Sequence, residues 1–97
     1  MLLKKKIKLM RQLVKSFSDM TQGVFKKDHY CLHIDYVDGN SKNFCFKRLK
    51  TALSQLQAMM GQEKYLNDVE EIYFVLYSES HDMYEIAAYE QGNLRVL

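Results

Sequence analysis

The sequence predicts a two-layer α+β domain, in which two helices pack against an antiparallel sheet of four to five strands. Two segments repeat apolar residues at helical spacing, and four others carry the aromatic and β-branched residues typical of strands, in the order α-β-β-α-β-β. A short segment at the C-terminal end can add a fifth strand. Short polar turns separate consecutive strands, and strands joined in this way pair antiparallel. The 97 residues are enough for one domain with one modest core.

The first predicted helix lies within residues 1–22. Apolar residues recur there at intervals of four, three, four and three, which places them on one helical face: Leu3, Ile7, Met10, Val14 and Phe17. A second line of residues, about 110° away around the helix, carries positive charge. We call it the basic stripe, and it consists of Lys4, Lys8, Arg11 and Lys15. We expect the helix to end at Gln22-Gly23, because glycine can take the left-handed conformation that closes a helix.

Residues 28–46 predict a β-hairpin with strands over 29–37 and 42–46. Apolar and polar side chains alternate along the first strand, so one of its faces is buried. Only a loop with an odd number of residues places Phe44 and Phe46 on that same face, because a shift of one residue turns every side chain to the other side. We therefore predict a three- or five-residue loop with a bulge, in which the numbers of opposite residues sum to 78 or 80.

Residues 47–61 predict the second helix, which ends at Gly61. Its apolar face is formed by Leu49, Ala52, Leu53, Leu56, Met59 and Met60. Residues 69–97 predict a second hairpin, with strands over 69–77 and 83–90, followed by a short edge strand or a tail. The first strand of this hairpin is apolar on both faces, so each of its faces needs a covering element or a partner.

The second face of this hairpin is the candidate interaction surface. Tyr73, Val75 and Tyr77 share it, and the alternation of the next strand places Tyr89 beside them. Aromatic side chains and methionine are enriched at the centres of protein interfaces. Two arrangements are open. The first helix either covers this face as a third layer, or both helices pack on the other face and leave the tyrosines free for a protein partner or a second copy.

Polar side chains gather on one face of the first hairpin: His29, Cys31, His33, Asp35 and Cys45. Cysteine and histidine near a carboxylate can bind zinc, so Cys31, His33 and Cys45 form a candidate metal site, although their spacing matches no standard zinc motif. In the alternative interpretation, both thiols act as small apolar side chains. Two cysteines are too few for a disulfide scaffold and indicate a reducing compartment.

The sequence contains no recognisable catalytic motif. A Cys–His nucleophile needs an oxyanion hole, and no glycine-rich turn precedes either cysteine. The glycines form no phosphate-binding loop. The paired carboxylates Glu70 and Glu71 are neighbours on a strand and therefore point to opposite faces. We expect a protein that is not an enzyme and that has no cofactor and no small-molecule substrate.

Charge is distributed unevenly along a chain whose net charge is only +2. Residues 1–27 hold eight basic side chains and one acidic one, whereas residues 66–97 hold one basic and seven acidic. The two ends either neutralise each other or form two opposite electrostatic faces. The basic stripe is then a solvated or protein-facing surface, a nucleic-acid surface that Lys47, Arg48 and Lys50 extend, or a membrane-surface helix. No apolar run is long enough to cross a bilayer.

These observations predict a small, cytoplasmic, non-enzymatic interaction module that binds a protein partner or itself, as a hetero-complex or a homodimer. Compact α+β domains with strong surface charge and no active site are typical of phage and other mobile-element proteins. Such proteins often bind and modulate or inhibit a host protein, for example a defence component. The alternative is a small nucleic-acid-binding protein that uses its basic helical face. A more distant alternative is a zinc or thiol site on the first hairpin.

Overall fold

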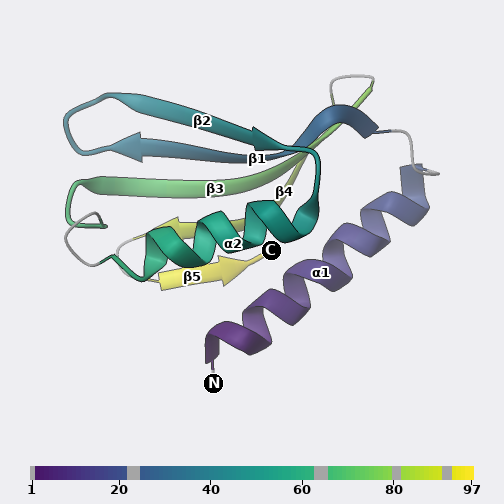
Figure 1. Ribbon diagram of the computed structural model, residues 1–97, viewed down its shortest axis with the longest axis horizontal. Coiled ribbons are helices and arrows are strands. Elements are labelled where there is room, and N and C mark those ends of the chain that lie inside the picture. Colours follow the sequence, from purple (N-terminus) through teal and green to yellow (C-terminus); the bar gives the residue numbers. More distant parts are fainter. Residues whose placement is uncertain (1, 22–24, 63–65, 80–81, 91–92) are drawn as a thin grey trace.

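The computed structural model describes residues 2–21, 25–62, 66–79, 82–90 and 93–97 (Figure 1). The elements are α1 (Leu2–Thr21), β1 (Phe25–Tyr36), β2 (Ser41–Phe46), α2 (Leu49–Met60), β3 (Val69–Ser78), β4 (Met83–Glu90) and β5 (Asn93–Val96). The strands form one antiparallel sheet in the order β2-β1-β3-β4-β5. This arrangement confirms the predicted two-layer α+β fold, with the fifth strand present.

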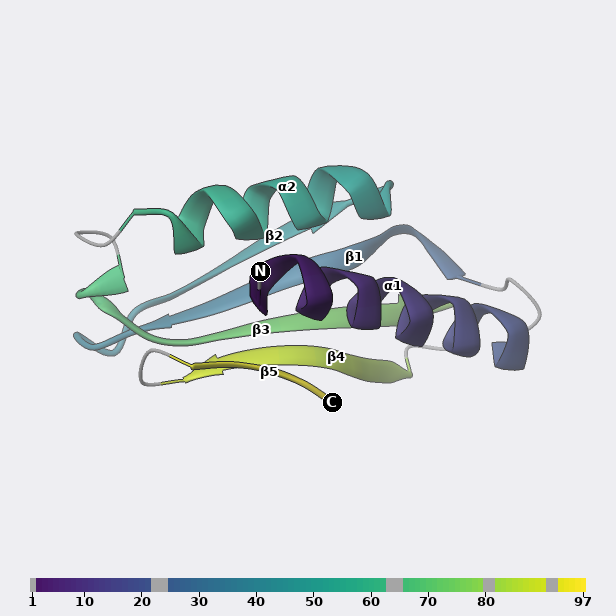
Figure 2. The same cartoon turned by 90° about the horizontal axis from the view of Figure 1, so that it is seen from below.

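Both helices lie on the same face of the sheet (Figures 1 and 2). α2 packs over β1 and β2, and α1 packs over β4 and β5. The core fills the space between the layers, and its largest fully buried side chains include Met10, Leu32, Ile34, Ile72, Phe74, Leu76 and Ile86. This arrangement decides between the two alternatives for the second sheet face, because both described helices pack on the side of Ile72, Phe74 and Leu76.

The apolar face of α1 follows the predicted spacing wherever its side chains are described. Met10 and Val14 are buried in the core and Ile7 is partly buried against it. The Lys6 ammonium donates a hydrogen bond to the backbone carbonyl of Leu94 on β5, which ties the helix to the edge of the sheet. The predicted end of this helix at Gln22-Gly23 lies outside the described residues.

The β1–β2 hairpin has the predicted parity but a different register. Leu32 lies opposite Phe44 and Tyr30 lies opposite Phe46, so both phenylalanines share the apolar face of β1, as expected. The numbers of opposite residues sum to 76 in every pair, however, and the predicted sums of 78 and 80 are wrong. The turn therefore lies earlier in the chain than the sequence suggested.

Hydrogen bonds at the turn explain this earlier position. The Tyr36 amide donates to the Asn40 carbonyl at 2.8 Å, and the Gly39 amide donates to the Tyr36 carbonyl at 3.0 Å. The loop thus holds three residues, an odd number as predicted. Gly39 has a φ of 91°, which a residue with a side chain rarely adopts. The Asp38 carboxylate accepts a hydrogen bond from the Asn40 backbone amide at 2.9 Å, and this bond stabilises the turn at Asp38.

β4 contains a bulge that changes which of its side chains share a face. Glu85 lies opposite Val75 and Ala87 lies opposite Phe74, so Ile86 is an extra residue without a partner on β3. Beyond the bulge the alternation is reversed. Tyr89 consequently lies opposite Ile72 on the helix side, where it is only 8% exposed as part of the core. The placement of Tyr89 on the interaction surface is therefore wrong.

The remaining boundaries differ little from the predicted ones. α2 begins at Leu49, because Arg48 has an extended backbone and serves as its N-cap residue. Gly61 closes this helix as expected, with its amide donating to the Gln57 carbonyl at 3.0 Å, but with a right-handed backbone. β1 begins at Phe25, earlier than the predicted strand, because Phe25 pairs with Ser78 at the far end of β3.

Candidate interaction surface

The sheet face that the two helices leave uncovered is the candidate interaction surface, and we call it the open face. Register places on it the odd-numbered residues of β3 from Glu71 to Tyr77 and their neighbours on the adjoining strands. Its members include His33, Asp35, Glu71, Tyr73, Val75, Tyr77, Met83, Glu85, Ala88, Glu90 and Arg95. Three of the four residues predicted for this surface therefore lie on it together, and Ala88 occupies the place expected for Tyr89.

A shallow hollow of about 330 Å³ lies at the centre of the open face and is lined by His33, Tyr73, Val75, Tyr77, Met83 and Glu85. Val75 is 3% exposed and forms its floor, between the two tyrosines of the same strand. Glu85 lies opposite Val75, and Met83 lies opposite Tyr77 with 60% of its surface exposed. The hollow thus combines an apolar floor, aromatic walls and one carboxylate.

Carboxylates surround the Tyr73 side of this hollow. The Tyr73 hydroxyl donates a hydrogen bond to the Glu71 carboxylate. The pKa of Tyr73 is raised to about 12, mainly by this hydrogen bond and further by burial and the negative charges of Glu71, Glu90 and Glu85. Arg95 compensates one of these charges, since its guanidinium lies 3.2 Å from the Glu90 carboxylate. The surroundings of the hollow are therefore predominantly negative.

A disulfide joins Cys31 of β1 to Cys45 of β2 on this same face of the sheet. The expectation of two free thiols is wrong, and neither sulfur is available to a metal. The candidate site of Cys31, His33 and Cys45 accordingly does not form, and the described residues hold no cluster of three or more potential metal ligands. His33 instead lies with its imidazole 3.4 Å from the Asp35 carboxylate.

The register of the hairpin explains why the sequence did not reveal this disulfide. Cys31 and Cys45 lie directly opposite each other, with 4.1 Å between their Cα atoms, a separation typical of a non-hydrogen-bonded antiparallel pair. The predicted sum of 78 placed Cys45 opposite His33 instead. The predicted turn was thus displaced by one residue from the observed one. This displacement was enough to predict a Cys–His site where the structure has a disulfide.

The basic stripe lies on the helix layer, away from the open face. Its members Lys4, Lys8, Arg11 and Lys15 are all exposed along α1. The three further cations Lys47, Arg48 and Lys50 are exposed at the start of α2. Positive charge thus gathers on the outer side of the helices and negative charge on the open face, which matches the alternative of two opposite electrostatic faces.

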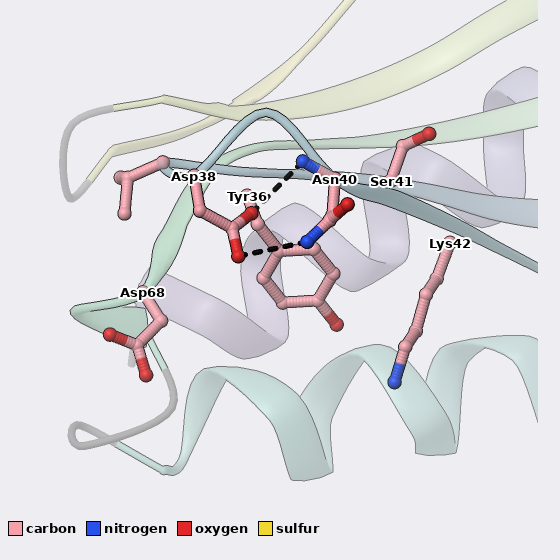
Figure 3. A pocket seen from close by; sticks show the side chains of 7 residues that line it. Tyr36, Asp38, Asn40, Ser41, Lys42 and Asp68 are labelled. Atoms are coloured by element: carbon pink, nitrogen blue, oxygen red, sulfur yellow. Dashed lines mark hydrogen bonds between the residues drawn. The ribbon is translucent and has the colours of Figure 1, made fainter.

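A larger hollow of about 680 Å³ lies at the β1–β2 turn (Figure 3). Both oxygens of Asp38 accept hydrogen bonds from Asn40, one from its backbone amide and one from its side-chain amide, each at 2.9 Å. The Lys42 ammonium lies 5.9 Å from the centre of the Tyr36 ring. These contacts stabilise the turn. We therefore interpret this hollow as a structural feature of the hairpin and not as a binding site.

Comparisons with known proteins add no functional information. The sequence matches no protein-family model, no curated protein and no solved structure. Neither of the two described helices has the length and apolar character needed to cross a membrane.

Proposed function

We propose that this protein is a non-enzymatic interaction module that binds a protein partner through the open face. The observation that supports this proposal most directly is the position of both described helices on the other side of the sheet (Figure 2). The helices thereby leave the half-buried Tyr73 and Tyr77 and the exposed Met83 around one hollow on the other face. An exposed apolar and aromatic group with a polar rim is typical of a protein-binding site.

The domain is large enough to offer the surface that a specific complex needs. The domain measures 39 by 31 Å across its two longer axes, and the sheet extends along its breadth. A standard interface needs about 800 Å² from each partner. Tyrosine and methionine at the centre and carboxylates around them follow the usual order of an apolar interface core and a charged rim.

The charge of the open face favours a different protein over a second copy as the partner. Two copies that met face to face across a two-fold axis would bring Glu71 and Glu85 of both chains together, and like charges in an interface cost free energy. A hetero-complex avoids this cost. The origin of the chain in a phage or mobile element, and inhibition of a host defence protein, remain predictions from the sequence.

Photocrosslinking from the open face tests the proposal. A photoreactive phenylalanine analogue replaces the exposed Met83 in one variant and the exposed Lys5 on α1 in a control variant. A captured protein is purified, and its affinity for the unlabelled chain is measured by calorimetry. We expect Tyr73→Ser with Tyr77→Ser to weaken binding by about thirtyfold or more, because aromatic residues at an interface centre contribute most of its free energy.

Two results would contradict this function. One is equal capture of the same protein from both crosslinking positions. The other is a folded double-tyrosine variant that binds the captured protein as tightly as the unaltered chain. Light scattering in the same experiment detects self-association. A mass of two chains that falls to one in the double variant would assign the open face to a second copy.

A second candidate function is nucleic-acid binding by the basic stripe. It is favoured by the exposure of Lys4, Lys8, Arg11 and Lys15 on one helix whose described neighbours in the sheet do not cover them. Fluorescence anisotropy with labelled duplex DNA and single-stranded RNA at two salt concentrations tests it. Four phosphate contacts give a log–log salt slope of about −3 to −4 on duplex DNA. Absence of binding at low salt, or unchanged binding by the Lys8→Glu and Arg11→Glu variants, excludes this function.

A further inference from the structure

We propose that the hollow between Tyr73 and Tyr77 receives a cationic side chain, arginine or lysine, from the protein partner. The inference rests on the proposed function, because it names the chemistry of the partner that the open face binds. It is carried by the shape of the hollow, by the kinds of side chain that line it, and by the charge around it. Each of these three features points to the same kind of ligand.

The walls of the hollow suit a flat or compact cation. Tyr73 and Tyr77 lie two residues on either side of Val75 on one strand, so their side chains project from the same face. Their Cα atoms are about 13 Å apart along the strand axis. The buried Val75 and the exposed Met83 provide apolar surface between them for an aliphatic stem. Aromatic ring faces attract ammonium and guanidinium groups, and long cationic side chains bury their methylene stems on such surfaces.

The charge of the hollow selects for a cation. Glu85 lines it, is exposed, and makes no hydrogen bond or ion pair within the described part of the chain. Within the described residues, Glu71 accepts a hydrogen bond from the neutral Tyr73 hydroxyl and forms no ion pair, so its negative charge is uncompensated there. Arg95 is committed to Glu90 by a contact of 3.2 Å. The carboxylate of Glu85 is therefore the natural counter-ion for a positive group that enters between the tyrosines.

The rest of the domain cannot supply that positive group from the basic stripe. α1 lies on the opposite face of the sheet, over β4 and β5, and the lysines of the basic stripe are exposed on that helix. His33 lines the hollow but contacts Asp35, with 3.4 Å between imidazole and carboxylate. Among the described residues, neither the basic stripe nor His33 fills the hollow, and we therefore assign the cation to another molecule.

Nuclear magnetic resonance titration with a small probe tests this inference without the partner. The probe is N-acetyl-arginine methylamide, and its neutral counterpart is the citrulline derivative, which has nearly the same shape but no charge. We expect the arginine probe to shift the amide signals of Val75, Tyr77 and Glu85 saturably, with a Kd of about 1 to 10 mM. The citrulline probe should bind at least about threefold more weakly, since it lacks the attraction to the carboxylate and the ring faces.

Matched variants locate the site. Glu85→Gln should weaken the arginine probe by about threefold or more, whereas Glu70→Gln removes the same charge from an exposed residue outside the hollow and should leave its affinity unchanged. Tyr77→Leu keeps the apolar bulk, removes the ring face and should also weaken binding. Equal binding of both probes, equal effects of the two glutamate variants, or no saturable shift would overturn the inference.

The outcomes separate this inference from the function on which it rests. If a partner binds the open face in a tyrosine-dependent way and the arginine probe does not bind, the cation site is wrong and the interaction module stands. If the probe binds at Glu85 and no captured protein binds the open face directly, the proposed function is wrong. When both succeed, Glu85→Lys should abolish partner binding while the chain remains folded.

Discussion

The hydroxyl of Tyr73 donates a hydrogen bond to the carboxylate of Glu71, which lies two residues earlier on the same face of β3. The contact orients the Tyr73 ring along the strand at the edge of the hollow. It also prevents the phenol from losing its proton easily, because a phenolate beside Glu71 would lose the hydrogen bond and gain a repulsion. One local contact thus links the shape of the open face to its charge.

Titration of tyrosine at high pH should reveal this contact. The raised pKa of Tyr73, about 12 against an ordinary 10, means that the folded chain holds this proton more tightly than the unfolded chain. Its contribution to stability is therefore complete below pH 10 and is lost as the pH rises towards 12. In absorbance titration at about 295 nm, Tyr73→Phe should remove a late-titrating component, and Glu71→Gln should move it to lower pH. Identical late titration in all three proteins would contradict the assignment.

Removal of the disulfide should destabilise the domain. Replacing both Cys31 and Cys45 with alanine should lower the free energy of unfolding by about 2 to 3 kcal/mol, because the bridge restricts the unfolded chain across 14 positions. Alanine is preferred to serine because Cys31 is only 1% exposed. Urea unfolding with and without a reductant measures the effect. The reductant should lower the free energy of unfolding of the unaltered chain and leave that of the double variant unchanged. Detection of two free thiols in the untreated protein would refute the disulfide.

The bulge at Ile86 predicts opposite roles for two large side chains of β4. Tyr89 belongs to the core, so Tyr89→Ser should lower the free energy of unfolding by about 3 kcal/mol or more. Met83 is exposed on the open face, and Met83→Ser should change the free energy of unfolding by less than about 0.5 kcal/mol. Chemical denaturation of both variants checks the pair. Similar effects would mean that β4 continues its alternation through Ile86.

The elements of this fold could be predicted because periodic burial determines them. The apolar face of α1 and the burial pattern of β3 each follow from the spacing of apolar residues along the chain. This spacing can be read directly from a single sequence. The parity of the first hairpin was predictable for the same reason. The prediction required Phe44 and Phe46 to share the face of Leu32, and only an odd loop allows this.

Features that depend on one extra residue could not be predicted in this way. The turn is centred on Asp38 because its carboxylate accepts a hydrogen bond from Asn40, and the spacing of apolar residues does not reveal such a local bond. The pairing of the two cysteines in the disulfide depends on the position of this turn. The bulge at Ile86 likewise has no marker such as glycine in the sequence of β4. It moved Tyr89 from the interaction surface into the core, whereas Tyr73, Val75 and Tyr77 share one face of β3 as predicted.

Two glycines at chain reversals should respond to alanine in opposite directions. Gly39 has a φ of 91° and no atom within 4 Å of an added Cβ, so Gly39→Ala suffers only backbone strain and should cost about 1 to 2 kcal/mol. Gly61 has a φ of −79°, and its Cβ would meet the Gln57 carbonyl at an ordinary 3.5 Å. Gly61→Ala should therefore stabilise the domain by about 0.4 to 1 kcal/mol, because alanine restricts the unfolded chain.

Urea unfolding of both variants, with Gly39→Asn as the matched control, measures this difference. Asparagine tolerates the left-handed region better than alanine does, so Gly39→Asn should recover part of the stability lost in Gly39→Ala. Such recovery would show that backbone conformation, and not the loss of flexibility at the turn, determines the cost. Equal destabilisation by alanine and asparagine would contradict the three-residue loop and, with it, the register that brings Cys31 opposite Cys45.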